Sequence, residues 1–194
     1  EVAMDWAGIF IVIGVLMAAF RRLVLRPKYL STNWDDWFAL GMLLLIALIG
    51  FTNEAMRLIA ANPAWAGYSI FGGWFASLYR SLGMTAESAA AWHNTLVVAH
   101  VVTALLLVAA VPFTKLRHMF NGPLNILVRP SRHIGALDKI EDMENTEILG
   151  VNKMTEFTPQ QLLSFDACLK CGRCQEACPA NISGMEYSPR DLVQ

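Results

Sequence analysis

Three long stretches with few charges constrain the fold more than any other feature of this sequence. Residues 6–20 carry no charge, and the apolar pattern continues to Leu25. A helix over residues 3–25 would be ~34 Å long, enough to cross the hydrocarbon core of a bilayer. Similar segments cover residues 36–60 and 86–117. The sequence therefore predicts an all-α membrane helical bundle with three spans.

Composition agrees with a membrane protein. Of all residues, 55% are hydrophobic and only 16% are charged, and six Trp and ten Phe are available for aromatic belts at the two interfaces. The net charge of −1 gives no reason to expect a nucleic-acid partner. The chain begins at Glu1 with no n-region or cleavage site of a signal peptide, so we expect a piece of a longer protein.

Between the second and third spans, residues 64–83 contain too many glycines for a further span. Apolar side chains recur there at i, i+1, i+4, i+5 and i+8, namely Trp74, Phe75, Leu78, Tyr79 and Leu82. This spacing predicts a short amphipathic helix lying in the membrane interface.

Basic residues in the loops predict the orientation of the spans. Those on one side are Arg21, Arg22, Arg26 and Lys28 after the first span, and Lys115, Arg117, Arg129, Arg132 and Lys139 after the third. The other side has only Arg57 and Arg80. The positive-inside rule then predicts a cytoplasmic C-terminal part.

All four cysteines fall in one motif, C-x2-C-x2-C-x3-C-P, formed by Cys168, Cys171, Cys174 and Cys178. Bacterial ferredoxins use this spacing to hold iron–sulfur clusters. Zinc is the alternative, but zinc sites favour two cysteine pairs with a long spacer. Gly172 permits a positive φ between ligands, and Lys170 and Arg173 add positive charge beside an anionic cluster. With no other cysteine for a structural disulfide, the motif suits a reducing compartment.

The cysteine motif follows a predicted short helix. Thr158, Pro159 and Gln161 form a helix-start signature, and the helix would run from 160 to 167. The acidic stretch 138–145 is typical of a linker or docking segment. We therefore expect a cytochrome b domain over 1–118, a cytoplasmic linker over 119–157 and a small α-helical ferredoxin-like segment over 158–194.

Four histidines are candidate ligands. On one straight helix, His100 and His118 would share a face about 27 Å apart, which suits two stacked haems. Each also has a simpler interpretation: a hydrogen bond to a neighbouring helix for His100, and a cation at a helix C-terminus for His118. His93 fits the outer interface, near a headgroup or quinone, and His133 fits the surface.

The segment from His100 through Pro112 to His118 closely resembles the last transmembrane helix of the cytochrome b (gamma) subunit of respiratory nitrate reductase. Residues 157–194 resemble the ferredoxin-like section of heterodisulfide-reductase-type proteins. The combination of these two parts in one chain resembles membrane-bound iron–sulfur oxidoreductases that link electron-transfer flavoprotein to quinone. The resemblance implies two b haems with His100 and His118 as axial ligands, in the plasma (inner) membrane of a prokaryote.

Two departures from the family pattern favour a sequence cut at both ends. The family has five spans with opposing haem ligands on the second, whereas three spans are predicted here and no histidine precedes His93. The family also carries a second cysteine motif after the first. We therefore expect Cys168, Cys171 and Cys174 to hold one [4Fe–4S] cluster and Cys178 a second, with a single four-cysteine cluster as the alternative.

These features predict an oxidoreductase that passes electrons between a cytoplasmic partner, such as electron-transfer flavoprotein, and membrane quinone. Glu54 and Arg57 are quinone-protonation candidates, although an ion pair one helical turn apart needs no function. Two alternatives stay open. One is a quinol-dependent heterodisulfide-type reductase, and the other is a non-redox membrane anchor with a structural cluster.

Overall fold

The computed structural model describes residues 2–131 and 150–193, and within these ranges it contains helices and no strand. The predicted all-α class is thereby confirmed. The chain divides into two compact units, Glu1–Thr114 and Lys115–Gln194. His133 and the acidic stretch 138–145 lie outside the described residues.

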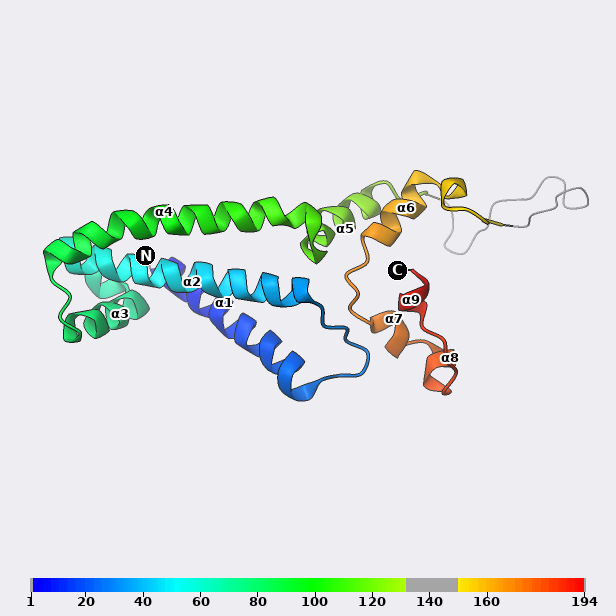
Figure 1. Cartoon of the computed structure of the whole chain (residues 1–194), viewed down its shortest axis with the longest axis horizontal. Coiled ribbons are helices and arrows are strands. Elements are labelled where there is room, and N and C mark those ends of the chain that lie inside the picture. Colours follow the sequence, from blue (N-terminus) through cyan, green and yellow to red (C-terminus); the bar gives the residue numbers. More distant parts are fainter. Residues whose placement is uncertain (1, 132–149, 194) are drawn as a thin grey trace, which may run out of the picture. The chain divides into compact units, whose positions relative to one another are not determined.

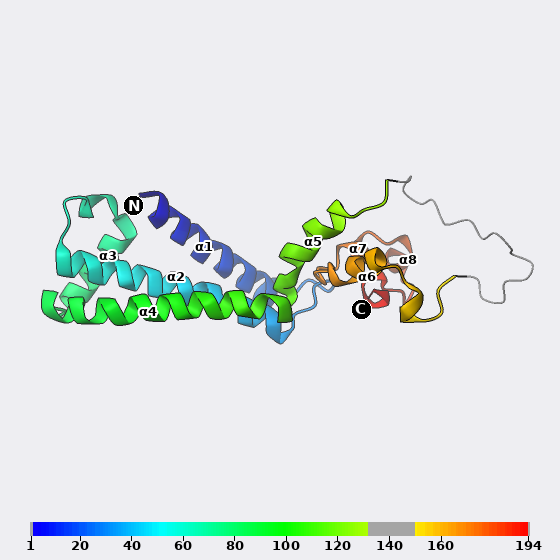
Figure 2. The same cartoon turned by 90° about the horizontal axis from the view of Figure 1, so that it is seen from above.

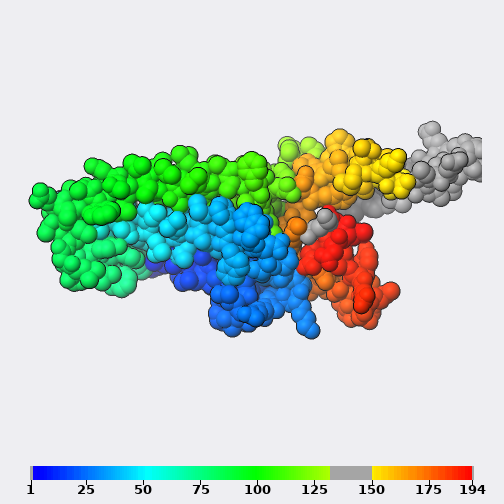
Figure 3. Space-filling model, viewed as in Figure 1, coloured from blue at the N-terminus to red at the C-terminus, as the bar shows by residue number. Residues whose placement is uncertain are grey.

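Three long helices make up most of the first unit: α1 (Val2–Phe20), α2 (Trp34–Ala61) and α4 (Ala86–Ala110). With the short turns η1 (Arg21–Leu25) and η3 (Val111–Phe113), all three are long and apolar enough to cross a membrane. Helix α2 is central, because α1, α3 and α4 all pack against it (Figures 1 and 2). In the space-filling view the side chains of α4, in green, lie directly along those of α2, in cyan (Figure 3).

The outer surface of α4 is apolar. Val98, Val101, Leu105 and Val108 each expose roughly half or more of their surface, between 49% and 66%. A polypeptide in hydrocarbon must satisfy its backbone polar groups internally, which α-helices do, and may leave apolar side chains facing lipid. The helix length and this surface together identify a membrane protein.

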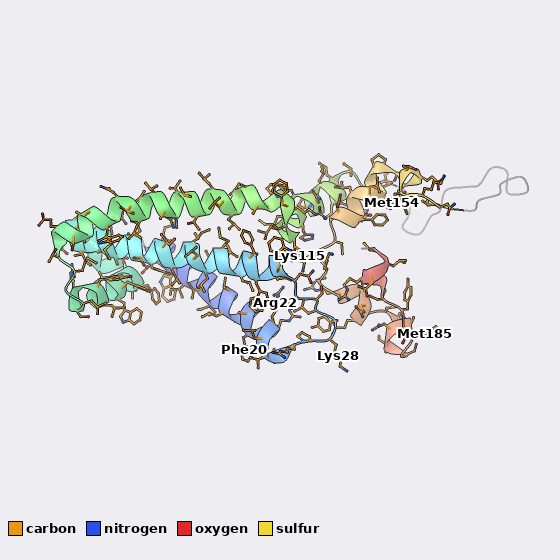
Figure 4. The ribbon with its side chains drawn as sticks, viewed as in Figure 1. Phe20, Arg22, Lys28, Lys115, Met154 and Met185 are labelled. Atoms are coloured by element: carbon orange, nitrogen blue, oxygen red, sulfur yellow. The ribbon has the colours of Figure 1, made fainter. Side chains whose placement is uncertain are left out.

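A partly buried ion pair fixes the connection between α1 and α2. Arg22 Nη2 lies 2.9 Å from Asp36 Oδ1, and the two side chains are only 18% and 9% exposed. Asp36 also accepts a hydrogen bond from the backbone N–H of Asn33, which begins α2. Arg22 and Lys28 are labelled in Figure 4, at the basic loop that the sequence predicts.

The short helix predicted between the second and third spans is present as α3 (Ile70–Ser81). Its apolar side chains divide between two directions. Phe75 and Tyr79 pack against the core of α2, whereas Trp74, Leu78 and Leu82 are exposed. The location of α3 in the membrane interface stays a prediction.

Short elements build the second unit. They are η4 (Lys115–Arg117), α5 (His118–Leu127), η5 (Met154–Glu156), α6 (Pro159–Asp166), α7 (Arg173–Glu176), α8 (Pro179–Ile182) and α9 (Pro189–Leu192); the labels Lys115 and Met154 in Figure 4 mark the starts of η4 and η5. Helix α5 packs on α6, and α7 packs on α8 and α9. The predicted helix start at Thr158 is confirmed, since Thr158 Oγ1 accepts from the N–H of Gln161 and Gln161 Oε1 accepts from the N–H of Thr158.

The premise of one straight helix from His100 to His118 is wrong. Pro112 lies in the 3-10 turn η3, where its missing N–H and its ring interrupt the α-helical hydrogen bonding. Thr114 then adopts an extended conformation, with φ −125° and ψ 175°. A new helix begins at His118. The 27 Å separation expected for a continuous helix therefore does not apply.

Candidate functional site

His100 lies on the wall of a cavity in the first unit. The cavity has a volume of about 400 Å³ and is lined by residues of α1 and α2 together with Ser69, which precedes α3, and His100 of α4. That size falls in the range of small-molecule sites. Glu54 and Arg57 line the same cavity, so the structure brings together three of the residues singled out from the sequence.

Among the described residues, the Nδ1 atom of His100 is buried and makes no hydrogen bond. The ring lies over Gly50 of α2, where an added Cβ would come within 3.4 Å of its Cε1 atom. Leaving a buried imidazole nitrogen without a partner costs free energy, about 1–3 kcal/mol for a typical polar group. A ring with an unused nitrogen beside a cavity fits the role of a metal ligand.

Glu54 and Arg57 form the ion pair that their spacing predicts. Arg57 donates from Nε and Nη2 to Glu54 Oε2, at 2.9 and 2.5 Å, and its guanidinium lies 4.5 Å from the centre of the Trp65 ring. The other carboxylate oxygen, Oε1, is buried and has no hydrogen-bond partner within the described part of the chain. One oxygen of Glu54 is therefore held by Arg57, and the second is available to a ligand.

His93 is not among the residues that line this cavity. It lies on α4 about two helical turns before His100, and its Nδ1 is also buried without a partner among the described residues. The structure therefore does not group His93 with Glu54 and Arg57.

Asp5 is a cavity residue that the sequence did not single out. Its side chain is buried and accepts from the backbone N–H groups of Phe71, at 2.7 Å, and Gly72, at 3.3 Å. These are free donors at the start of α3, so Asp5 of α1 acts as a cap for a helix 66 residues away in sequence. Gly72 has no room for a Cβ, which would lie 2.6 Å from Glu54 Cγ. The one signal in the sequence for this role of Asp5 is that an acidic residue stands in an otherwise nearly uncharged span.

The cysteine motif winds through a tight loop and two short helices. Cys168 lies two residues after the last residue of α6, Cys174 lies in α7, and Cys178 precedes Pro179 at the start of α8. Gly172 has φ +75°, which confirms the expected positive φ. Lys170 also has a positive φ, +58°, a conformation that the sequence gave no reason to expect. Two left-handed residues thus turn the chain back between Cys168 and Cys174.

The four cysteines of the motif all keep some exposed surface. Cys174 is exposed, and the other three are half-buried. Across residues 2–131 and 150–193, no three Cys, His, Asp or Glu side chains gather closely enough to hold one metal ion. The preference for an iron–sulfur cluster over zinc therefore rests on the spacing of the cysteines.

Arg190 of α9 lies near this loop. Its side chain is 15% exposed, and its Nε donates to Asp191 Oδ1 at 2.8 Å. This hydrogen bond raises the pKa of Arg190, and the negative charges of Asp191, Cys174 and Cys168 add to the effect. The same contact, with a hydrogen bond involving Ser188, lowers the pKa of the exposed Asp191. No pattern in the sequence indicates Arg190, because this residue lies sixteen positions beyond Cys174.

His118 makes a direct contact with the start of the cysteine loop. Its Nδ1 lies 2.5 Å from the backbone oxygen of Ala167, the residue before Cys168. Since a carbonyl oxygen only accepts, Nδ1 carries the hydrogen and, in the neutral ring, Nε2 keeps its lone pair. Hydrogen bonds of this kind orient metal-ligating histidines and raise their basicity. His118 is therefore prepared to bind a metal through Nε2.

Long apolar helices, half-buried histidines and a ferredoxin-type cysteine motif together define a membrane-anchored iron–sulfur protein with a cytochrome b-like helical part. The family model for the nitrate reductase gamma subunit matches residues 1–134, and the chain belongs to this family. Residues 163–182 match a 4Fe-4S binding domain. The resemblance drawn from the sequence is thus confirmed.

Several curated proteins are similar to the chain. The "EtfAB:quinone oxidoreductase" of Syntrophomonas wolfei is 33% identical, with 98% of this chain and 28% of that protein covered. The "Probable iron-sulfur-binding oxidoreductase FadF" of Bacillus subtilis is 30% identical, with 94% and 26% covered. The "Probable membrane-anchored ferredoxin" of Chromohalobacter salexigens is 34% identical, with 59% and 19% covered. The chain therefore spans between about a fifth and little more than a quarter of the length of these relatives. No solved structure matches it.

Proposed function

We propose that the chain carries electrons between a cytoplasmic redox protein of the electron-transfer-flavoprotein type and the quinone pool of a prokaryotic plasma membrane. Cys168, Cys171 and Cys174 would hold a [4Fe–4S] cluster, and His100 and His118 would each bind the iron of one of two b haems. The name of the Syntrophomonas wolfei relative, EtfAB:quinone oxidoreductase, supports both the flavoprotein and the quinone. The basic loops support a cytoplasmic cysteine loop.

The observation that carries this proposal is the hydrogen bond between His118 and Ala167. Because Ala167 is bonded to Cys168, a candidate haem ligand and a candidate cluster ligand are joined by one hydrogen bond and a few covalent bonds. A non-redox anchor would need no such contact. The bound cluster and haems supply one-electron transfer, which no side chain of this protein can carry out alone.

The residues around the cavity serve the quinone end of this route. In quinone reduction Glu54 would take up a proton from water and pass it through Oε1 to the quinone, and Arg57 holds the carboxylate in place through Oε2. Helix α2 packs against both α1 and α4, and the Nδ1 atom of His100 is buried beside this cavity. The reductase alternative uses the same residues with electrons flowing from quinol to a disulfide.

The test is a reduced-minus-oxidised spectrum of the full-length protein in membranes, followed by mixing with reduced electron-transfer flavoprotein and a quinone. We expect b-type haem bands that appear with the flavoprotein and disappear with the quinone. Absent haem bands would establish the anchor alternative. Haem reduction by quinol and reoxidation by a disulfide, but not by flavoprotein, would establish the reductase.

A further inference from the structure

Helix α5 has its polar side buried and its apolar side exposed. The half-buried residues recur at i, i+3, i+4 and i+7, and they are His118, Asn121, Gly122 and Asn125. The exposed residues are apolar: Met119, Phe120, Leu124, Ile126 and Leu127 expose 64%, 68%, 46%, 74% and 80% of their surface. A helix on the surface of a soluble protein has the opposite arrangement.

Specific bonds hold the polar side against α6. Gln160 Nε2 donates to Asn125 Oδ1 at 3.1 Å, and His118 bonds to the oxygen of Ala167. These two contacts lie about two turns apart on α5, so they fix its rotation about its own axis. The apolar side cannot turn inward without breaking both contacts.

The chain keeps α5 close to the membrane. His118 lies five positions after Phe113, which ends the third membrane-length helix, so the two Cα atoms are at most about 18 Å apart. Lys115 and Arg117 precede α5, and Arg129 follows it. Cations flanking an apolar helix surface match the anionic headgroups of bacterial lipids.

We propose that α5 is an interfacial helix. Its exposed apolar side lies at the boundary between headgroups and acyl chains, and its polar side carries α6 and the cysteine loop. The occupant of the apolar surface is therefore lipid, not another polypeptide segment. This inference needs only that the protein is membrane-bound, and it does not depend on the electron route.

The test incorporates the photocrosslinker p-benzoylphenylalanine at Ile126 in the full-length holoprotein, reconstituted in bilayers of anionic and neutral phospholipid. After irradiation, mass spectrometry should find lipid adducts on the peptide that contains α5. The matched control is Asn125, the next residue along the helix but on its polar side. The control should crosslink to the segment around Gln160 and give several-fold less lipid adduct.

Crosslinks from Ile126 to polypeptide, or a lipid yield no higher than that from Asn125, would overturn the proposal. The EPR signal of the cluster checks that each variant is folded. If the Ile126 variant loses that signal, the same measurement at Phe120 replaces it and is judged by the same two outcomes.

Discussion

His100 and His118 are both half-buried histidines, but their surroundings differ in a way that their sequence neighbourhoods do not show. His100 has a buried Nδ1 without a partner among the described residues and borders a cavity with a carboxylate. His118 has its Nδ1 bound to a backbone carbonyl beside the cysteine loop. The contrast indicates two roles, with His100 at the quinone end of the proposed route and His118 at the cluster end.

Replacement of either histidine should give the largest effect. His100→Ala and His118→Ala should each lose one of the two b haems, measured by haem content and difference spectra. Only His118→Ala should also change the EPR spectrum of the cluster, since only His118 contacts Ala167. His93→Ala is the control and should keep both haems. Two haems in His100→Ala and one in His93→Ala would contradict the assignment.

The cysteine loop can be divided further by Cys178→Ser in the full-length protein. We expect loss of one cluster with a second retained, because Cys178 directly precedes α8 and lies after the segment that carries the other three thiols. Iron analysis gives the number of clusters, and EPR with redox titration identifies the survivor. A parent protein with one cluster, abolished by Cys178→Ser, would support the single-cluster alternative instead.

At the cavity, Glu54→Gln should slow electron transfer to quinone by roughly 100-fold, the lower end of what positioned acid–base groups contribute. Haem content should not change, because Glu54 contacts Arg57 and not His100. Glu87→Gln, an exposed carboxylate in the first turn of α4, is the matched control. An unaltered quinone rate in Glu54→Gln would mean that the ion pair is purely structural.

The smallest expected effect concerns Arg190. Removing its charge in Arg190→Gln should lower the reduction potential of the cluster, because a nearby cation stabilises the more negative, reduced form. A change of about 1 kcal/mol corresponds to on the order of 40 mV for one electron. Asp191→Asn should move the potential in the opposite direction, and Arg190→Lys should stay near the parent value. EPR-monitored redox titration measures the potential in all three variants. If the parent protein and Arg190→Gln have equal potentials, Arg190 does not tune the cluster.

The sequence by itself determined the helical class, the three membrane-length segments and the cluster motif. These depend on local quantities: the number of consecutive apolar residues, the interval between cysteines, and capping signals such as Thr158 with Gln161. Each can be evaluated without knowing which distant residues meet. The Glu54–Arg57 pair belongs to the same group, because its spacing of one helical turn creates the contact.

Other features required the tertiary structure. The helix breaks at Thr114 because of the conformation in which the chain leaves the turn at Pro112. Helix periodicity alone predicted a helix that continues past this point. Asp5 with the start of α3, and His118 with Ala167, join residues 66 and 49 positions apart. Their formation depends on which helices pack together. That choice follows from the summed burial of many side chains, which no single stretch of sequence contains.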